Sequence, residues 1–330
     1  MNYKEAGVDI ALGNQFVRSL ISNTSYPPEV ISGIGGFCSL YRLPDTSILL
    51  AASCDGVGTK LKLAQQFKEL GYLKTIGIDL VAMVVNDLIT SGARPLFFLD
   101  YLSLSDITKQ TDELEDIIFG IKKGCQEAGI CLIGGETAEH PRKLYLGDLD
   151  VAGFGVGLVE EDNVLGPDRV REGDILLGIV SSGVHSNGFS LIRSLFPEVI
   201  RLGQNQQLLS SLMAPTIIYV KDLLEVYSVF KTSIHAAAHI TGEGLEHNIS
   251  RVVPDELIPI IDWDSFATPL LFLALQELGQ IETSELRRVF NCGIGFVLVV
   301  DSVYASAISR TLQRLGQFTV VIGSVQKKSA

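Results

Sequence analysis

The sequence predicts a protein of two domains, each built from mixed helices and strands, and three observations support this prediction. The chain has 330 residues, of which 47% are hydrophobic, enough for two cores at roughly 150 residues per domain. Short apolar runs typical of strands alternate with longer runs of helical pattern. Residues 160–174 are dense in charge, with Gly166-Pro167 at their middle, so we expect a domain boundary near residue 166.

In the first half, apolar runs that end in turn residues or a carboxylate predict strands at residues 47–54, 96–99 and 130–133. Residues 111–129 predict a helix, because acidic residues at its start and lysines further along suit the helix dipole. We expect this helix to end at Gly129.

The second half begins with a predicted strand at residues 175–180, followed by a loop of small residues and a helix at residues 189–196. It ends with strands at residues 295–300 and 318–323, separated by a helix around residues 302–315. The chain contains no short-period repeat.

The composition excludes some classes of partner. A count of 26 basic against 38 acidic residues gives a net charge of −12, which argues against binding nucleic acid or an anionic membrane through a broad basic surface. Glu5 and Asp9 argue against a secretory signal, and we expect no transmembrane helix, since glycines and polar residues interrupt the longest uncharged run. Five scattered cysteines without zinc spacing favour a reduced, cytoplasmic protein.

The first candidate site is the segment 55–60, which follows an apolar strand and opens a helical run. Glycines let backbone N–H groups close on an anion, Lys60 adds a charge, and Asp55 offers a hard oxygen ligand for Mg²⁺. The spacing is not that of a Walker A loop. A glycine-rich turn with a surface lysine fits this pattern equally well.

The second candidate is a helical run, residues 77–89, that is apolar nearly all round. Asp79, Asn86 and Asp87 share one stripe of it, so two carboxylates face the same way from a buried helix. Such a stripe is costly unless something cationic neutralises it. We favour a Mg²⁺ or Mg–nucleotide site over a pair of solvated carboxylates.

The third candidate is the segment 133–139, where a strand runs into Gly134-Gly135 and two carboxylates follow. Glu136 is expected to project from the carboxyl edge of the sheet. Glu139 fits a ligand role and a helix-start role equally.

Two further segments offer hydrogen bonds. Residues 181–188 lie between a strand and a helix and suit a phosphate or a sugar, although their serines are also typical of helix caps. Residues 239–247 make another glycine turn, and the spacing of their histidines excludes a zinc helix. We interpret His235 and His247 as structural.

Together these segments resemble the phosphoribosylformylglycinamidine cyclo-ligase family, the aminoimidazole ribonucleotide synthetases. The resemblance runs over almost the whole chain, on residues 3–9, 33–37, 55–62, 77–100, 134–139, 150–154, 181–190, 215–216, 239–242 and 290–295.

The resemblance implies an α+β fold of two domains, 1–166 for ATP binding and dimerisation and 167–330 for the substrate cleft. It implies a homodimer with a β-barrel shared between N-terminal domains, and an ATP- and Mg²⁺-dependent closure of formylglycinamidine ribonucleotide to aminoimidazole ribonucleotide, with release of ADP and phosphate. ATP phosphorylates the amide oxygen, the amidine nitrogen attacks, and phosphate leaves.

The resemblance also assigns roles to residues. The metal ligands are Asp55, Asp87 and Glu136. Lys60 faces the ATP phosphates, and Lys60 and His185 are the catalytic candidates. The other nucleotide-site positions are Gly56, Gly58, Thr59, Asp79 and Asn86, and the substrate positions are Ser182, Ser186, Asn187, Thr241 and Gly242.

The chain departs from the family pattern in three places: at Cys38-Ser39, at His140 to Arg142, and at Glu243, where a third consecutive glycine is usual. In the last region Ser250 also stands in place of a proline before Arg251. None of these removes a predicted metal ligand.

Other members of the superfamily fit less well. Residues 1–30 lack the cysteine of a selenophosphate synthetase, and the chain does not end in the cysteine of the hydrogenase-maturation relatives. Residues 7–9 and 35–37 fit the cyclo-ligase better than the formylglycinamidine synthetases, and thiamine monophosphate kinases lack the full 182–188 run. A relative with another phosphoryl acceptor and a non-catalytic ATP-binding homologue remain the alternatives.

Overall fold

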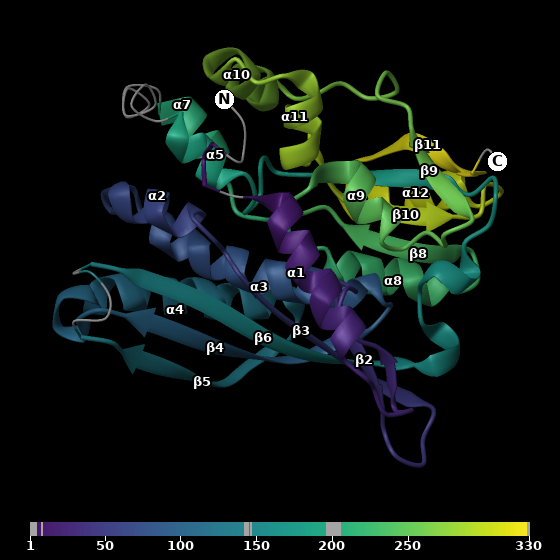
Figure 1. The fold of residues 1–330 in the computed structure, drawn as a ribbon, viewed down its shortest axis with the longest axis horizontal. Helices are drawn as coiled ribbons and strands as arrows, with labels where there is room; N and C mark the ends of the chain where they lie inside the picture. Colours follow the sequence, from purple (N-terminus) through teal and green to yellow (C-terminus); the bar gives the residue numbers. More distant parts are fainter. Residues whose placement is uncertain (1–4, 8, 142–144, 146, 196–205, 329–330) are drawn as a thin grey trace.

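A computed structural model describes residues 5–7, 9–141, 145, 147–195 and 206–328. It contains two β-sheets, one in each half of the chain, with helices packed against them (Figure 1). The expected mixed α+β fold of two domains is confirmed. Among the described residues, no helix is both long and apolar enough to span a bilayer.

The sheet of the first domain has six strands in the order β1-β2-β3-β6-β4-β5. Neighbouring strands are antiparallel except β4 and β5, which are parallel and joined through a helix. The strands are β1 (Val30–Ser32), β2 (Ser39–Arg42), β3 (Ile48–Gly56), β4 (Arg94–Leu104), β5 (Cys131–Glu139) and β6 (Leu149–Glu160).

The helices of this domain are α1 (Ile10–Asn23), α2 (Lys60–Gln66), the 3₁₀ turn η1 (Lys68–Leu70), α3 (Tyr72–Thr90) and α4 (Ile107–Ala128). Helices α3 and α4 pack closely because both carry a glycine at the contact. A Cβ on Gly77 would lie 2.1 Å from the Ile117 carbonyl oxygen, and one on Gly120 would lie 2.0 Å from that of Lys74. Only glycine permits this approach.

Three predicted elements of the first domain are longer than expected: α4, β5 and β4, which spans Arg94–Leu104 where the sequence predicted 96–99. Helix α4 begins at Ile107 because the Asp106 side chain accepts the Thr108 N–H and caps it. Strand β5 continues to Glu139, since it pairs with β4 along its whole length. Glu136 therefore lies within a strand, and the expectation that it projects from a strand end is wrong.

The second domain holds a fully antiparallel sheet in the order β8-β10-β7-β11-β9. The predicted strands at 175–180, 295–300 and 318–323 and the helix around 302–315 are confirmed. The predicted helix at 189–196 is found as α5, and Phe196 lies outside the described residues. The elements are β7 (Ile175–Val180), α5 (Phe189–Ser194), α7 (Gln206–Leu212), α8 (Val220–Val229), β8 (Ile234–His239), α9 (Gly244–Ser250), β9 (Leu257–Ile261), α10 (Leu270–Gly279), α11 (Thr283–Val289), β10 (Ile294–Val300), α12 (Ala305–Arg314) and β11 (Thr319–Lys327).

Helix α3 joins the two domains. It packs on β3, β6 and α4 of the first domain and on α8 and β8 of the second, which explains why it is apolar nearly all round. The charged segment expected to contain the boundary forms the short turns η2 (Glu161–Asn163) and η3 (Pro167–Arg169) between the two sheets.

Candidate active site

A group of charged side chains gathers where the two domains meet. Asp55 stands at the end of β3, Asp87 on α3, His239 at the end of β8, and Arg251 just after α9. The Nδ1 atom of His239 lies 2.8 Å from Oδ1 of Asp87. Because this hydrogen bond engages one carboxylate oxygen, Oδ2 of Asp87 is left for another ligand.

The carboxylate of Asp87 acts on that of Asp55. Burial and the nearby charge of Asp87 raise the pKa of Asp55 to about 6, although a 2.7 Å hydrogen bond from the Gly56 N–H acts in the opposite direction. Two neighbouring carboxylates at a joint between domains are stabilised by a divalent cation.

The donor set fits Mg²⁺ rather than a metal held wholly by protein. Within the described ranges, no cluster of three or more His, Cys, Asp or Glu side chains has the arrangement of a metal site. Mg²⁺ typically binds through one or two carboxylates and completes its shell with waters and substrate phosphates. Asp55 and Asp87 match that requirement.

Glu136, the third predicted metal ligand, lies elsewhere. It pairs across the sheet with Tyr101, which pairs with Ala152, which pairs with Gly56, so three strand spacings, about 14 Å, separate it from the end of β3. It shares the open face of the sheet with Tyr101, which is 42% exposed. Within one chain, Glu136 therefore does not join Asp55.

Asp55 lies on the opposite, helix-covered face. Its cross-strand partner is Gly153, where a Cβ would meet the side chains of Phe98 and Leu80. Glu139 is also distant from the acidic pair, because it accepts the Ile107 N–H at 3.1 Å and caps the start of α4.

Lys60 is engaged by other groups of the protein, whereas the sequence predicted that it faces the ATP phosphates. Its ammonium is fully buried, 2.8 Å from Asp79 Oδ2, and it donates hydrogen bonds of 2.9 Å to the carbonyls of His185 and Ala214. Burial lowers the pKa of Lys60, and the charge of Asp79 opposes that shift. Lys60 is the cation that the buried carboxylate requires.

Asp79 and Asn86 are likewise committed to joining the domains. Asp79 Oδ1 accepts two 2.7 Å hydrogen bonds from Thr216, one from its N–H and one from its hydroxyl. Asn86 donates to the Ile217 carbonyl at 2.8 Å and accepts from the Tyr219 N–H at 3.1 Å. Of the three residues on the predicted stripe, only Asp87 lies near Asp55.

The loop 181–188 packs against residues 214–216, the segment that also contacts Lys60 and Asp79. Ser182 donates to the Pro215 carbonyl at 2.6 Å, and the Ser186 hydroxyl lies 3.0 Å from that of Thr216. These serines therefore anchor the loop and do not cap α5. Thr59 contributes a further contact between the domains, with its hydroxyl 3.1 Å from that of Ser190.

His185 is fully buried and has a left-handed backbone, with φ of 57°. Its Nε2 accepts the Ser182 N–H at 3.3 Å. Burial, and then the nearby charges of His239 and Lys60, lower the pKa of His185 well below its usual value. The ring is therefore neutral at physiological pH.

The two predicted substrate segments meet. A Cβ on Gly242 would lie 3.7 Å from Asn187 Oδ1, and Asn248 holds the turn by donating to the Gly242 carbonyl at 2.9 Å. The Thr241 hydroxyl donates to Asn248 Oδ1 at 3.4 Å. Gly58 makes the turn before α2 with φ of 55°, and nothing lies within 4 Å of its Cβ position.

Besides Asp79 Oδ2, which lies 2.8 Å from the Lys60 ammonium, three buried side-chain polar atoms have no hydrogen-bond partner among the described residues: His185 Nδ1, Asn187 Nδ2 and His239 Nε2. A buried polar group without a partner costs about 1–3 kcal/mol. Since all three belong to the loops and strand end around Asp87, we expect ligand atoms or water to satisfy them.

Reasoning from the sequence assigned no role to His239 or Arg251. Both lie in segments that the sequence singled out, but their partners are distant in the chain. The Arg251 guanidinium lies 3.8 Å above the Phe37 ring and donates to the Gly36 carbonyl at 2.8 Å. It thereby holds the glycine-rich loop 33–37 against the second domain.

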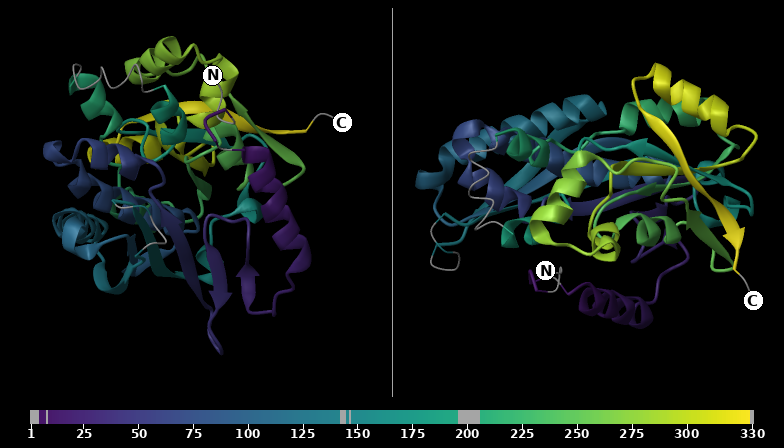
Figure 2. Two further views of the ribbon diagram at one scale, coloured as in Figure 1. Left: turned by 60° about the vertical axis from the view of Figure 1, so that its left-hand side comes forward. Right: turned by 90° about the horizontal axis from the view of Figure 1, so that it is seen from above.

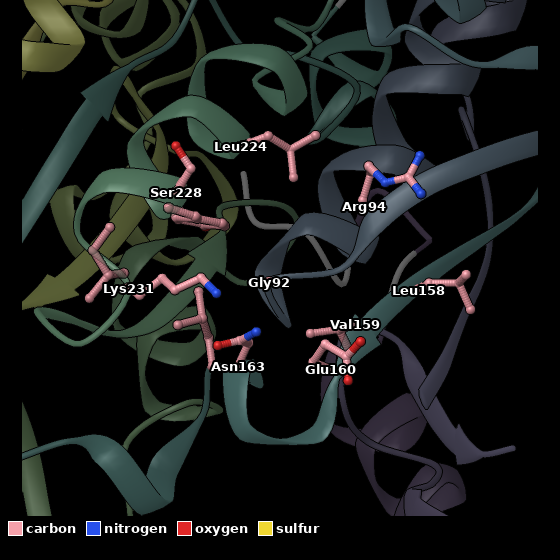
Figure 3. A pocket seen from close by; sticks show the side chains of 12 residues that line it. Gly92, Arg94, Leu158, Val159, Glu160, Asn163, Leu224, Ser228 and Lys231 are labelled. Carbon is pink, nitrogen blue, oxygen red and sulfur yellow. The ribbon is translucent and has the colours of Figure 1, made fainter. Parts of the chain in front are cut away.

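A separate cavity of about 230 Å³ lies at the joint between the domains (Figure 3). Gly92, Arg94 and Leu158 of the first domain and Leu224 and Lys231 of the second are among its lining residues. It contains none of the predicted site residues, so it is distinct from the acidic pair.

The chain matches two family models along most of its length. The AIR synthase related protein N-terminal domain matches residues 35–159, and the AIR synthase related protein C-terminal domain matches residues 171–330. These matches define a two-domain protein of the AIR synthase class.

Full-length relatives narrow this class. The phosphoribosylformylglycinamidine cyclo-ligase of Xanthomonas campestris pv. campestris (strain B100) is 45% identical and aligned over 98% of each chain. That of Xylella fastidiosa (strain 9a5c) is 45% identical over 98% of this chain and 93% of the relative. The chain therefore belongs to the phosphoribosylformylglycinamidine cyclo-ligase family, a family of ligases.

Solved structures of low identity share the fold. Thiamine-monophosphate kinase from Stenotrophomonas maltophilia K279a superposes with a TM-score of 0.61 at 19% identity, covering 96% of this chain and 93% of that one. AaThiL complexed with AMPPCP and TMP gives 0.64 at 15% identity, covering 100% and 94%. At these identities the similarity establishes the architecture alone.

The raised pKa of Asp55 predicts a pH-dependent effect of replacing it. Above pH 6 the Asp55 carboxyl of the folded protein is charged although burial disfavours that charge, which lowers the free energy of unfolding. This loss of stability disappears as the pH falls from about 6 towards 4, because the folded state takes up the proton first. We expect Asp55→Asn to raise the free energy of unfolding by about 1–2 kcal/mol at pH 8 and to leave it unchanged below about pH 4.

Urea denaturation at the two pH values measures this effect. Asp112→Asn, on the exposed face of α4, is the matched control and should change neither value. An equal effect of Asp55→Asn at both pH values would show that the carboxyl is not destabilised by its surroundings.

Proposed function

We propose that this chain catalyses the ATP- and Mg²⁺-dependent cyclisation of formylglycinamidine ribonucleotide to aminoimidazole ribonucleotide, a step of purine biosynthesis, with release of ADP and phosphate. The observation that carries the proposal is the 45% identity to cyclo-ligases along nearly the whole chain. The Asp55–Asp87 pair in the joint between the domains supports it.

The reaction must turn an amide oxygen, which is a poor leaving group, into phosphate. The oxygen attacks the γ-phosphorus of ATP, the amidine nitrogen then bonds to the carbon, and the C–O bond breaks while the nitrogen loses its proton. Bound Mg²⁺ would neutralise the phosphoryl charge. Asp55 and Asp87 would hold this ion, and His239 would keep Asp87 in place through its 2.8 Å hydrogen bond.

The second domain supplies groups for the ribonucleotide. Asn187 and Gly242 lie side by side, and the Asn187 amide has a donor without a partner. In the neutral ring of His185 the Nε2 atom accepts the Ser182 N–H, so the Nδ1–H is the group that can donate a hydrogen bond to the ribonucleotide. Ser182 and Ser186 position this loop through residues 215 and 216.

The Asp87 carboxylate provides the test of the proposal. Purified protein given formylglycinamidine ribonucleotide, ATP and Mg²⁺ should form ADP and aminoimidazole ribonucleotide in equal amounts. Asp87→Asn should leave the protein folded but lower turnover at least about 100-fold, since it weakens the metal site. Asp112→Asn is the surface control.

Each other outcome would contradict a different part of the proposal. ADP without the ring-closed product would indicate another phosphoryl acceptor. ATP binding without ADP formation would indicate a non-catalytic homologue. Full activity of Asp87→Asn would remove Asp87 from the metal site.

We also propose a homodimer in which the open faces of two N-terminal sheets form a shared barrel. Helices α3 and α4 cover one face of the sheet, whereas large apolar side chains are exposed on β2, β4, β5 and β6. They are Tyr41, Tyr101, Ile133 and Phe154. Large apolar side chains exposed on the open face of a sheet are typical of a protein interface, and a second copy offers a matching surface. All five cysteines are free thiols, which supports a cytoplasmic location.

A single charge at the centre of this face tests the dimer. Phe154 is 39% exposed on β6, so Phe154→Asp should convert the dimer to a monomer in sedimentation velocity, because it buries an unpaired charge. Phe318→Asp, at a position 77% exposed in the second domain, should leave the mass unchanged. A monomeric wild-type protein at micromolar concentration would contradict the proposal.

A further inference from the structure

The backbone at Glu243 is strained for the residue it carries. Its φ of 72° lies in the left-handed region, where a side chain with a Cβ is disfavoured. The resemblance to the family leads one to expect glycine at this position. A residue that keeps a side chain under strain needs a compensating interaction.

The carboxylate of Glu243 supplies that interaction. Its Oε1 accepts a 2.9 Å hydrogen bond from the Asn14 amide of α1, and its Oε2 lies 2.5 Å from His247 Nε2. The side chain therefore links three parts of the chain: the N-terminal helix, the turn that begins with Thr241, and α9.

Helix α1 has few other attachments. It lies outside the body formed by the two sheets, as the view from above shows (Figure 2). Its Leu12 and Phe16 side chains are 64% and 65% exposed. Near its end, Ile21 Cδ1 lies 3.3 Å from the Cβ position of Gly35. Helix α1 thus touches the second domain at Glu243 and the first domain at the glycine-rich loop.

Arg251 lies between these two attachments. It donates to the carbonyls of Gly35 and Gly36, and its charge interacts with those of Glu243, Asp55 and Asp87. Cavities adjoin on both sides. One of about 580 Å³ is lined by Asn14, Glu243 and His247, and one of about 530 Å³ by Gly36, Phe37 and Arg251. Helix α1 therefore runs from the Glu243 turn to the glycine-rich loop, and both of its attachments adjoin Arg251, whose charge interacts with the acidic pair.

We propose that Glu243 is a positioning residue that pins α1 as a strap across the approach to the Asp55–Asp87 site. The strap is released for ligands to enter and closes behind them. The identity of those ligands, a ribonucleotide and ATP, rests on the proposed function. The pin, by which we mean the attachment of α1 through the hydrogen bond between Glu243 and Asn14, does not rest on it.

Replacing Glu243 by glycine separates the pin from the backbone strain. Glycine adopts the left-handed conformation freely, so Glu243→Gly relaxes the turn while it releases α1. Asn14→Ala removes the same hydrogen bond and leaves the turn strained. Glu243→Gln keeps an oxygen that can accept from Asn14, and it is the conservative variant that should restore the pin.

Hydrogen exchange of the α1 amides, measured on the ligand-free full-length chain, is the first readout. We expect Glu243→Gly and Asn14→Ala each to speed this exchange about tenfold, as loss of a hydrogen bond to a charged group implies. The double variant should match either single variant, and Glu243→Gln should match the wild type. Unchanged exchange in Glu243→Gly, or additive effects in the double variant, would overturn the pin.

Steady-state kinetics provide the second readout. Glu243→Gly should raise the KM for the ribonucleotide several-fold with little change in kcat, because the strap holds bound ligand and does not touch the reacting atoms. Faster exchange with an unchanged KM would overturn the strap and leave Glu243 a purely structural tether. A wild-type chain without turnover would refute the proposed function, and the exchange experiment would still decide on the pin.

Discussion

The ion pair between Lys60 and Asp79 is the interaction on which the arrangement of the two domains depends. Both side chains are fully buried, and the ammonium also satisfies two carbonyls of the second domain, those of His185 and Ala214. Burying two charges is expensive, and it is tolerated only where hydrogen bonds engage the remaining donors and acceptors. Thr216 provides two such bonds to Asp79. The pair therefore fixes the second-domain loops against α3.

Helix α3 turns this attachment into a site. Asp79 lies about two turns before the adjacent residues Asn86 and Asp87 on one stripe of this helix, and Asp79 and Asn86 hold residues 216–219 of the second domain. With the domains held there, β8 places His239 in hydrogen-bond contact with Asp87, and the end of β3 places Asp55 near Asp87. The acidic pair is formed because two domains meet along one helix.

The sequence predicted those parts of the fold whose signal is local. The apolar runs predicted the strands, and the charged segment 160–174 predicted the connection between the two sheets. The ordered motifs indicated the family. Partners distant in the chain could not be predicted: a buried stripe required a cation, but nothing local showed that Lys60, 19 residues away, supplies it. Glu136 was misplaced because two glycines suggested that β5 ends early, whereas pairing with β4 carries it on to Glu139. His239 and Asp87, 152 residues apart, meet only in the folded chain.

A double-mutant cycle on Lys60 and Asp79 tests this account most directly, with unfolding by urea as the readout. Lys60→Met strands a buried carboxylate and should cost about 3–5 kcal/mol, whereas the double variant with Asp79→Asn should recover at least about 2 kcal/mol of that loss. Binding of ATP to the folded single variant should change little. A Lys60→Met protein of unchanged stability and much weaker ATP binding would contradict the account, because it would place Lys60 at the phosphates.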